Sequence, residues 1–572
     1  MRPNEISVFD VIGPIMIGPS SSHTAGALRI ARVAASLLAE PLAAVRCRLY
    51  GSFASTGSGH GTDRALLAGA LGFGADDPRI RDSYRYAAEQ GVRVSMEPVS
   101  LTERELAEMH PNTVDIQLED RGGTGVSVRG ISTGGGRILI TRVNGVEVEI
   151  SGLYNTLVIR NQDRPGVISA MTGILAEHGI NIAYMRIYRE DRGAMAWAII
   201  ETDEAVPPLV PERLRALPSV EQAVLIPQLA PEGAAAGPLP EAVIVRPDGK
   251  IETVGRRSGT SRPAGRLLRR EDVSFAAAAE LLTAVERTGL APATLMRARE
   301  CLLFGGDDAL HLSRMERSWR VMQRSARAAI ESPASSLGGL IGGEAQRVWQ
   351  HADSAVGGPV LNRAMAYALA VIETNAAMGQ IVAAPTAGAA GILPAALLAC
   401  SETRNASEAA LLDALFTAAA VGLFIMAHGS VSGAEGGCQA ETGSAAAMAA
   451  AALVVLDGGT AAQALAAAST CLQNVLGLVC DPIGGLVEAP CQRRNALGVA
   501  NALVSAAMAL AGLPPVVGLD AMIQALGEVG SCLPASLRET GEGGTAVAWK
   551  AEHGVSSGAL GSVLDRALCY DN

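Results

Sequence analysis

The stretch from residue 271 to about 553 constrains the fold most, because Ala- and Leu-rich segments of helical length alternate there with glycine-rich loops. Aromatic residues make up only 3% of the chain, so small aliphatic side chains must fill its cores. Small side chains let neighbouring helices approach closely, and this composition predicts a compact all-α domain. No short repeat period is visible in the stretch, so a solenoid is not expected.

The rest of the chain predicts two further domains, a linker and a tail. Residues 1–153 mix short apolar strands with glycine-rich turns and are expected to form an α/β domain. Residues 154–228 follow the order βαββαβ, which predicts a separate small domain. Residues 229–270 are rich in Pro, Gly, Ala and Arg, the composition of a linker, and residues 554–572 are expected to form a C-terminal tail. The predicted fold class is therefore multidomain: α/β, then βαββαβ, then mostly α-helical.

Charge and cysteine usage indicate the compartment and exclude some partners. The formal net charge is -11, and a chain this acidic repels nucleic acid and anionic lipid. The N-terminus lacks a basic region followed by a long apolar stretch, so no secretory signal is expected. The uncharged stretch Asn495–Leu519 could suggest a membrane span, but its Asn and Pro residues favour a buried Ala-rich helix. Nine cysteines, an odd number, without an export signal predict thiols in a reducing cytoplasm.

Three cysteines of the helical domain, Cys438, Cys480 and Cys491, lie in Gly- or Pro-bearing segments next to helices. Their spacings of 42 and 11 residues include no CxxC pair, which argues against zinc. Three separated thiolates suit a 4Fe–4S cluster with one open iron, although spacing alone equally allows three cysteines buried in an Ala-rich core. The two lysines, Lys250 and Lys550, lie in no motif suited to a Schiff base, so pyridoxal phosphate is not expected.

Two N-terminal motifs and several glycine-rich loops could also carry chemistry. The hydroxyl run Ser20–Ser22 precedes a predicted helix, where hydroxyls either cap the helix or bind a carboxylate. His60 stands between two glycines, where it could transfer a proton or be an ordinary loop histidine. The glycine-rich loops of the helical domain either connect helices or bring backbone close to a small ligand. They are Leu337–Glu344, Glu373–Gly379, Ala384–Gly391 and His428–Ser432.

Five long motifs together resemble the iron–sulfur L-serine dehydratase family. They are IGPSSSHTAGALR, GSFASTGSGHGTD, APTAGAAGILPA, GAEGGCQAE and CDPIGGLVEAPCQRRN. The order of the parts also fits, with a β-type domain, a small domain that resembles an ACT domain, and an α-type catalytic domain. In many relatives the β and α parts are separate chains, so this chain looks like a fusion. The resemblance covers nearly everything except residues 229–270 and the last twenty or so.

The resemblance implies roles for individual residues. It assigns Cys438, Cys480 and Cys491 as the three cluster ligands, with Cys569 as a candidate fourth ligand in the resting state. Cys569 departs from the pattern of some relatives, because three residues follow it. For the ACT-like unit it implies either regulation by serine or structural coupling only, at Asp163, Gly166 and Asn181. We expect the substrate-binding positions to lie in the motifs and the loops near them, at Ser20, Ser21, Ser22, Thr62, Asp63, Asn375, Thr386, Gly388, Arg493 and Asn495.

The expected reaction removes water from L-serine to give aminoacrylate, which hydrolyses to pyruvate and ammonia in amino-acid degradation and gluconeogenesis. The open iron would act as a Lewis acid on the hydroxyl, and a histidine would accept the α-proton. His60 is the first choice for this base, His23 the second and His428 the third. Arg493 and Asn495 are expected to hold the substrate carboxylate. We expect a cytoplasmic homodimer, with a lyase for cysteine or another β-substituted amino acid, or a serine sensor without turnover, as alternatives.

Overall fold

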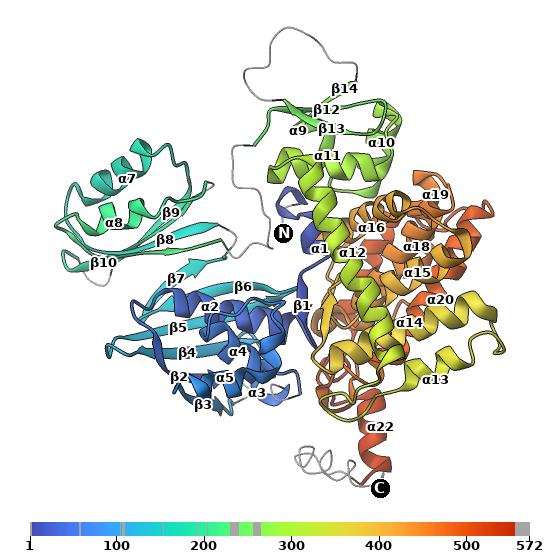
Figure 1. Cartoon of the computed structure of the whole chain (residues 1–572), viewed down its shortest axis with the longest axis horizontal. Coiled ribbons are helices and arrows are strands. Elements are labelled where there is room, and N and C mark those ends of the chain that lie inside the picture. Colours follow the sequence, from blue (N-terminus) through green and yellow to red (C-terminus); the bar gives the residue numbers. More distant parts are fainter. Residues whose placement is uncertain are drawn as a thin grey trace. The chain divides into compact units, whose positions relative to one another are not determined.

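The computed structural model describes residues 3–56, 59–102, 105, 109–152, 154–189, 192–202, 204–228, 239–254 and 265–554. The chain forms two compact units (Figure 1). The helical unit consists of Met1–Ser21 together with Leu239–Asn572. The other unit, Ser22–Pro238, contains the α/β domain and the ACT-like domain.

The α/β domain is built on a six-stranded sheet with the order β3-β2-β4-β5-β6-β7. Only β2 and β3 run parallel, and the other neighbours are antiparallel. Helices α2 (Ala27–Ser36) and α4 (Thr62–Ala70) pack against each other so closely that a Cβ on Gly69 would lie 2.2 Å from the Leu28 carbonyl oxygen. The strands are β2 Leu42–Leu49, β3 Arg93–Pro98, β4 Thr113–Asp120, β5 Gly125–Gly134, β6 Arg137–Val143 and β7 Val146–Ile150, and the other helices are α3 Gly51–Thr56 and α5 Ser83–Glu89.

The ACT-like domain has an antiparallel four-stranded sheet in the order β11-β8-β10-β9. Its elements follow one another as βαββαβ, which confirms the predicted pattern. Apolar side chains of β8, β10 and both helices form one core, in which Met171 and Leu175 are fully buried. The elements are β8 Asn155–Gln162, α7 Val167–Glu177, β9 Ile182–Arg189, β10 Met195–Thr202, α8 Leu209–Arg215 and β11 Val220–Ile226.

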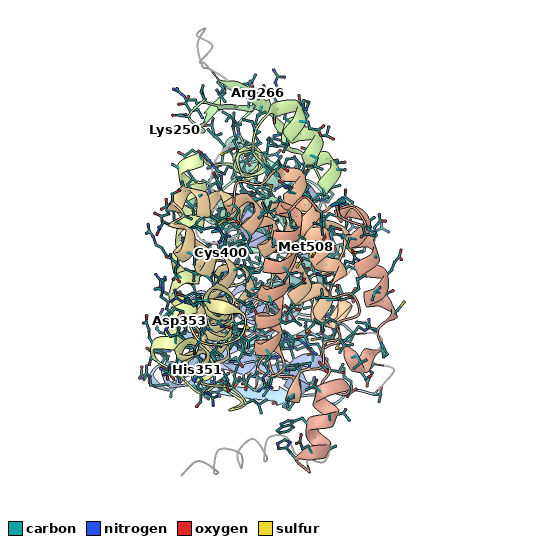
Figure 2. The ribbon with its side chains drawn as sticks, turned by 90° about the vertical axis from the view of Figure 1, so that its right-hand side faces the viewer. Lys250, Arg266, His351, Asp353, Cys400 and Met508 are labelled. Carbon is teal, nitrogen blue, oxygen red and sulfur yellow. The ribbon has the colours of Figure 1, made fainter. Side chains whose placement is uncertain are left out.

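The large unit is predominantly helical, as predicted, and its Ala-rich helices α14, α15, α16, α18 and α20 pack against one another. Two described segments are long and apolar enough to cross a membrane, Glu408–His428 and Gln439–Leu456, but 83% of the apolar 18-residue window in each is buried inside the fold. They are therefore core helices. Figure 2 shows Cys400 on α15 and Met508 on α20 within this bundle. The helices are α10 Ala278–Thr288, α11 Pro292–Phe304, α12 Asp308–Glu331, α13 Glu344–Gln350, α14 Gly358–Ala376, α15 Ile392–Arg404, α16 Glu408–His428, α17 Gly433–Gly436, α18 Ser444–Leu456, α19 Ala461–Gln473, α20 Cys491–Leu510, α21 Leu519–Cys532 and α22 Gly544–Glu552.

The first 21 residues belong to the helical unit, which differs from the prediction of one domain over 1–153. Strand β1 (Ile15–Ile17) pairs antiparallel with β15 (Gln380–Val382). The short helix α1 (Val8–Val11) packs against α16, and the buried carboxylate of Glu300 accepts hydrogen bonds from its N-terminus. Pairing between strands more than 360 residues apart leaves no local signal in the sequence.

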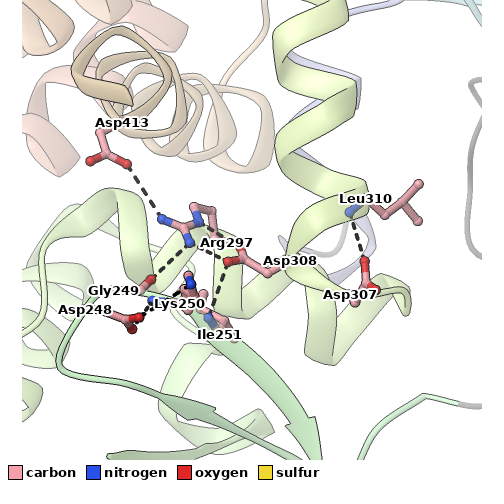
Figure 3. A network of polar contacts seen from close by, with 9 residues as sticks. All are labelled: Asp248, Gly249, Lys250, Ile251, Arg297, Asp307, Asp308, Leu310 and Asp413. Atoms are coloured by element: carbon pink, nitrogen blue, oxygen red, sulfur yellow. Dashed lines mark hydrogen bonds and ion pairs between the residues drawn. The ribbon is translucent and has the colours of Figure 1, made fainter. Parts of the chain in front are cut away.

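Part of the predicted linker also differs, because it folds into a small sheet on the helical unit. Strands β12 (Ala242–Val245), β13 (Ile251–Val254) and β14 (Arg266–Arg269) form three antiparallel strands in the order β13-β12-β14, and the short helix α9 (Arg270–Val273) follows. The turn between β12 and β13 is fixed by Arg297, which donates to the Gly249 carbonyl (Figure 3). All four residues of β12 are apolar and buried. The linker-like composition of the surrounding sequence hid this short apolar strand.

A candidate metal centre and a histidine pair

The three predicted ligand cysteines are buried within the helical unit. Cys438 lies between α17 and a π-helical turn at Gln439–Gly443, and Cys480 pairs with Arg538 in an isolated β-bridge. Cys491 is the first residue of α20. The exposed fractions of these three cysteines are 1%, 2% and 7%. Backbone far apart in the sequence thus converges around thiol groups, as a metal centre requires.

The sulfur atoms of Cys438 and Cys480 and a carboxylate oxygen of Glu441 lie within 4.8 Å of one another. The hydrogen bond to Cys438, followed by burial, raises the pKa of Cys480 well above its usual value. Burial and the charges of Cys438 and Glu441 raise the pKa of Cys491 in the same way. Such thiols lose their protons readily only when a cation compensates the charge, and metal binding supplies that compensation.

Two carboxyl groups lie beside these thiols. Glu441 accepts a 2.6 Å hydrogen bond from the Thr386 hydroxyl, and a Cβ on Gly388 would lie 2.7 Å from the same carboxylate oxygen. Glu539 has a left-handed backbone (φ 65°), and its amide donates to the Cys480 carbonyl at 2.8 Å. Burial, with a smaller contribution from the Glu441 charge, raises the pKa of Glu539 to about 8. The centre is therefore rich in acidic groups.

Arg494 brings a positive charge to this acidic group. Its Nη1 donates to the Cys438 sulfur at 3.4 Å and to the Val479 carbonyl at 2.9 Å. Its Nη2 lies 2.7 Å from a carboxylate oxygen of Asp481. The sequence had pointed to its neighbour Arg493, which is exposed. Glu441, Glu539 and Arg494 were all missed, although Glu441 lies in the motif GAEGGCQAE and Arg494 in CDPIGGLVEAPCQRRN.

Several predicted substrate-binding residues of the helical unit gather on the loop Ala384–Gly391. Asn375 donates to the carbonyls of Pro19 and Ala387, and the Ser21 hydroxyl accepts from the Ala387 amide. Asn495 donates to the Gly388 carbonyl at 2.7 Å and accepts from the Gly391 amide. The side-chain amides of Asn375 and Asn495 thus hold the backbone of this loop in place. By contrast, His428 is exposed at the end of α16, where its Nε2 lies 3.0 Å from the Ala276 carbonyl oxygen.

In the other unit, His23 and His60 form a buried pair with ring centroids 4.5 Å apart. The two ring nitrogens of His23 bond to the hydroxyls of Ser22 and Ser52, at 3.0 and 2.9 Å. The Thr24 hydroxyl donates to the His60 carbonyl, and Gly61 turns the chain with φ 60° before α4 begins. Ser52 lies in the motif GSFASTGSGHGTD but was not among the predicted site residues.

The next two predicted residues begin α4. Thr62 is fully buried, and a carboxylate oxygen of Asp63 accepts from the Tyr84 hydroxyl at 3.0 Å. The α4 N-terminus thus follows directly on the histidine pair, in the part of the motif GSFASTGSGHGTD that the structure describes.

Stability should depend on pH through His23. Burial, and next the charge of His60, hold the pKa of His23 well below its usual value of about 6.5. The unfolded chain then binds a proton that the folded chain does not, so the free energy of unfolding should fall as pH drops below about 6.5. The slope should not exceed about 1.4 kcal/mol per pH unit for this group. Urea unfolding of wild type and His23→Asn from pH 5 to 8 tests this, and equal slopes in both proteins would contradict it.

The predicted regulatory residues lie at two loops of the ACT-like domain. Asp163 accepts from the Gly193 amide at 3.0 Å and pairs with Arg189 at 3.2 Å. Gly166 precedes α7 with φ 87°, and the Asn181 amide donates to a carboxylate oxygen of Glu204. The remaining candidate, Cys569, lies outside the described residues.

Comparison with protein-family models identifies each part of the chain. Residues 7–142 match the model "Serine dehydratase beta chain", residues 155–219 match "ACT domain", and residues 264–546 match "Serine dehydratase alpha chain". The fold and the matched parts define a multidomain lyase with an ACT domain.

Curated relatives include both fused and separate chains. The "L-serine dehydratase" of Streptomyces coelicolor is 31% identical over 564 residues, which is 95% of this chain and 98% of that protein. The "Probable L-serine dehydratase, alpha chain" of Bacillus subtilis is 44% identical over 253 residues, 43% of this chain and 84% of that protein. The "Probable L-serine dehydratase, beta chain" of the same organism is 40% identical over 220 residues, 38% of this chain and 97% of that protein. This chain belongs to the L-serine dehydratase family, as a fusion of its two parts.

Proposed function

We propose that this chain is an iron–sulfur L-serine ammonia-lyase, which converts L-serine through aminoacrylate to pyruvate and ammonia. The observation that carries the proposal is the burial of Cys438, Cys480 and Cys491 in one acidic, glycine-lined region. Arg494, three residues after Cys491 on α20, donates to the Cys438 sulfur at 3.4 Å, so the start of α20 lies against the same group. A set of core cysteines would not need two carboxyl groups and a guanidinium around it.

The residues present fit a 4Fe–4S cluster. Three thiols, and no described fourth cysteine in the group, leave one iron without a cysteine ligand. A Cβ on Gly433 would lie 3.1 Å from the Cys480 sulfur, so glycine leaves the sulfur room for a metal. When bound, the cluster supplies an open iron that acts as a Lewis acid on the serine hydroxyl. Cys569 stays a candidate for a resting ligand of that iron.

The side chains of the protein have three tasks in this proposal. His60 accepts the α-proton, with His23 and His428 as the second and third candidates for the base. Arg493 and Asn495 hold the substrate carboxylate, and the hydroxyls of Ser20–Ser22, with Thr62 and Asp63, also bind the substrate. Asn375, Thr386, Gly388 and Asn495 shape the loop Ala384–Gly391, because their described contacts fix its backbone or the carboxylate beside it.

The remaining parts of the proposal concern regulation and assembly. The ACT domain is proposed to couple serine binding to activity through the loops of Asp163, Gly166 and Asn181. The protein is proposed to act as a homodimer. It is proposed to act in the cytoplasm, because thiol ligands to iron are kept reduced there.

The specificity of the reaction provides the test. Protein prepared without oxygen should form pyruvate from L-serine with a kcat/KM at least about 100-fold above that for L-cysteine, since a site that contacts a hydroxyl discriminates strongly against analogues that lack it. A coupled assay of pyruvate with both substrates measures this. Equal turnover of L-cysteine, or serine binding without pyruvate formation, would overturn the assignment.

A further inference from the structure

One side chain connects all three cysteine segments of the helical unit. Arg494 is three residues after Cys491, so it extends from the first turn of α20. It donates to the sulfur of Cys438, and it binds the residue on each side of Cys480, namely the Val479 carbonyl and the Asp481 carboxylate.

Asp481 is itself fixed on its other side. Its second carboxylate oxygen accepts a 2.6 Å hydrogen bond from the Thr545 amide in the first turn of α22. A Cβ on Gly544 would lie 2.2 Å from that same oxygen, so α22 approaches Asp481 as closely as glycine allows. The Arg494 side chain is 13% exposed and that of Asp481 3% exposed. The guanidinium is therefore held in one position by groups that solvent barely reaches.

We propose that Arg494 is a positioning residue of the metal centre: it donates a hydrogen bond to the Cys438 thiolate and holds the three cysteine segments together. The inference rests on the proposed function, because it assumes a cluster at these cysteines. A hydrogen bond and a positive charge at a ligand sulfur favour the more negative, reduced state of an iron–sulfur cluster. Arg494 should thus make the cluster easier to reduce, and it should also increase the amount of iron that the protein retains.

The chain offers a closely matched control in Arg297 (Figure 3). The Arg297 side chain is 11% exposed, and it pairs with the buried carboxylate of Asp308, donates to the Gly249 carbonyl and lies 3.9 Å from Asp413. It therefore reproduces the burial, the carboxylate and the carbonyl contact of Arg494 without a described hydrogen bond to a cysteine sulfur. Replacing it removes a buried guanidinium from the same unit and leaves the cysteine segments unaltered.

The experiment compares Arg494→Gln, Arg494→Lys and Arg297→Gln with wild type after oxygen-free reconstitution with iron and sulfide. Two quantities are measured: iron per chain, and the midpoint of reduction followed by electron paramagnetic resonance. For Arg494→Gln, the ratio of reduced to oxidised cluster at the wild-type midpoint should fall at least tenfold, a shift of 59 mV for one electron. Arg494→Lys keeps the positive charge, so its midpoint of reduction should lie between those of Arg494→Gln and wild type. Arg297→Gln should keep the wild-type midpoint.

Each outcome bears on one proposal only. If both Arg494 variants keep the wild-type midpoint and iron content, the role of Arg494 is wrong while the cluster stands. If the Arg494 variants retain no iron while Arg297→Gln does, the positioning role is supported. If wild type itself takes up no iron, the proposed function fails before Arg494 is tested.

Discussion

Replacing Cys491 with serine should remove both the iron and the activity. We expect Cys491→Ser, purified without oxygen, to hold less than about a tenth of the wild-type iron and to form pyruvate about a thousandfold more slowly, which corresponds to an activation barrier about 4 kcal/mol higher. The reason is that a serine hydroxyl is a poor iron ligand, whereas Cys491 lies buried at the start of α20 beside the other thiols. Iron analysis and a pyruvate assay on the same sample measure both effects.

The control for this variant is Cys400→Ala, which also removes a buried thiol. Cys400 lies on α15, is 2% exposed and has no described contact with the cysteine group (Figure 2). Cys400→Ala should keep wild-type iron and activity, apart from a small loss of stability. Full iron and turnover in Cys491→Ser, or equal losses in both variants, would contradict the assignment of the ligands.

Replacing His60 with asparagine should lower kcat by a factor of about 10² to 10⁴ while the iron content stays at the wild-type value. His60 is buried, its ring centroid lies 4.5 Å from that of His23, and an imidazole is suited to accept a proton near neutral pH. KM for L-serine should change little, because the proposal gives carboxylate binding to other groups. Steady-state kinetics with iron-normalised protein measure the split between kcat and KM.

Two more histidine variants make this prediction specific. His178→Asn alters a histidine of the ACT domain whose Nδ1 lies 2.8 Å from the Ile174 carbonyl oxygen, and it should leave kcat unchanged. His23→Asn should reduce kcat less than His60→Asn does. A larger loss in His23→Asn would move the role of base to His23, and a His60→Asn enzyme within about threefold of wild type would exclude His60.

Local patterns in the sequence predicted the elements whose contacts are close along the chain. The ACT domain follows from a βαββαβ order within about 70 residues. The helical unit follows from Ala- and Leu-rich segments of helical length. These elements depend on hydrophobic periodicity and turn chemistry, both of which a single sequence displays.

Contacts between distant segments could not be predicted in the same way. The pairing of β1 with β15 transfers the first 21 residues to the helical unit, and no local feature of Ile15–Ile17 indicates its partner. The cysteine spacing was compatible with a metal centre or with core cysteines, and only the family motifs separated the two. The three cysteines converge because of the way in which α19, α20 and the segment around Glu539 pack. The spacing of the cysteines in the sequence does not encode this packing.

The choice between Arg493 and Arg494 illustrates the limit at the scale of one residue. Successive residues on a helix point about 100° apart, so only one of two neighbouring arginines can face the cysteines. The phase of α20 is set by its packing on α14 and α18, and this phase turns Arg494 inward and Arg493 to the surface. The sequence established that an arginine follows Cys491 but not which of the two would reach the sulfur.

The most direct test of the central claim measures iron and pyruvate formation in the same oxygen-free preparation as a chelator removes the metal stepwise. The rate of pyruvate formation from L-serine should fall in proportion to the remaining cluster, and reconstitution with iron and sulfide should restore both the cluster and the rate. An undiminished rate in protein that no longer contains iron would contradict the central claim.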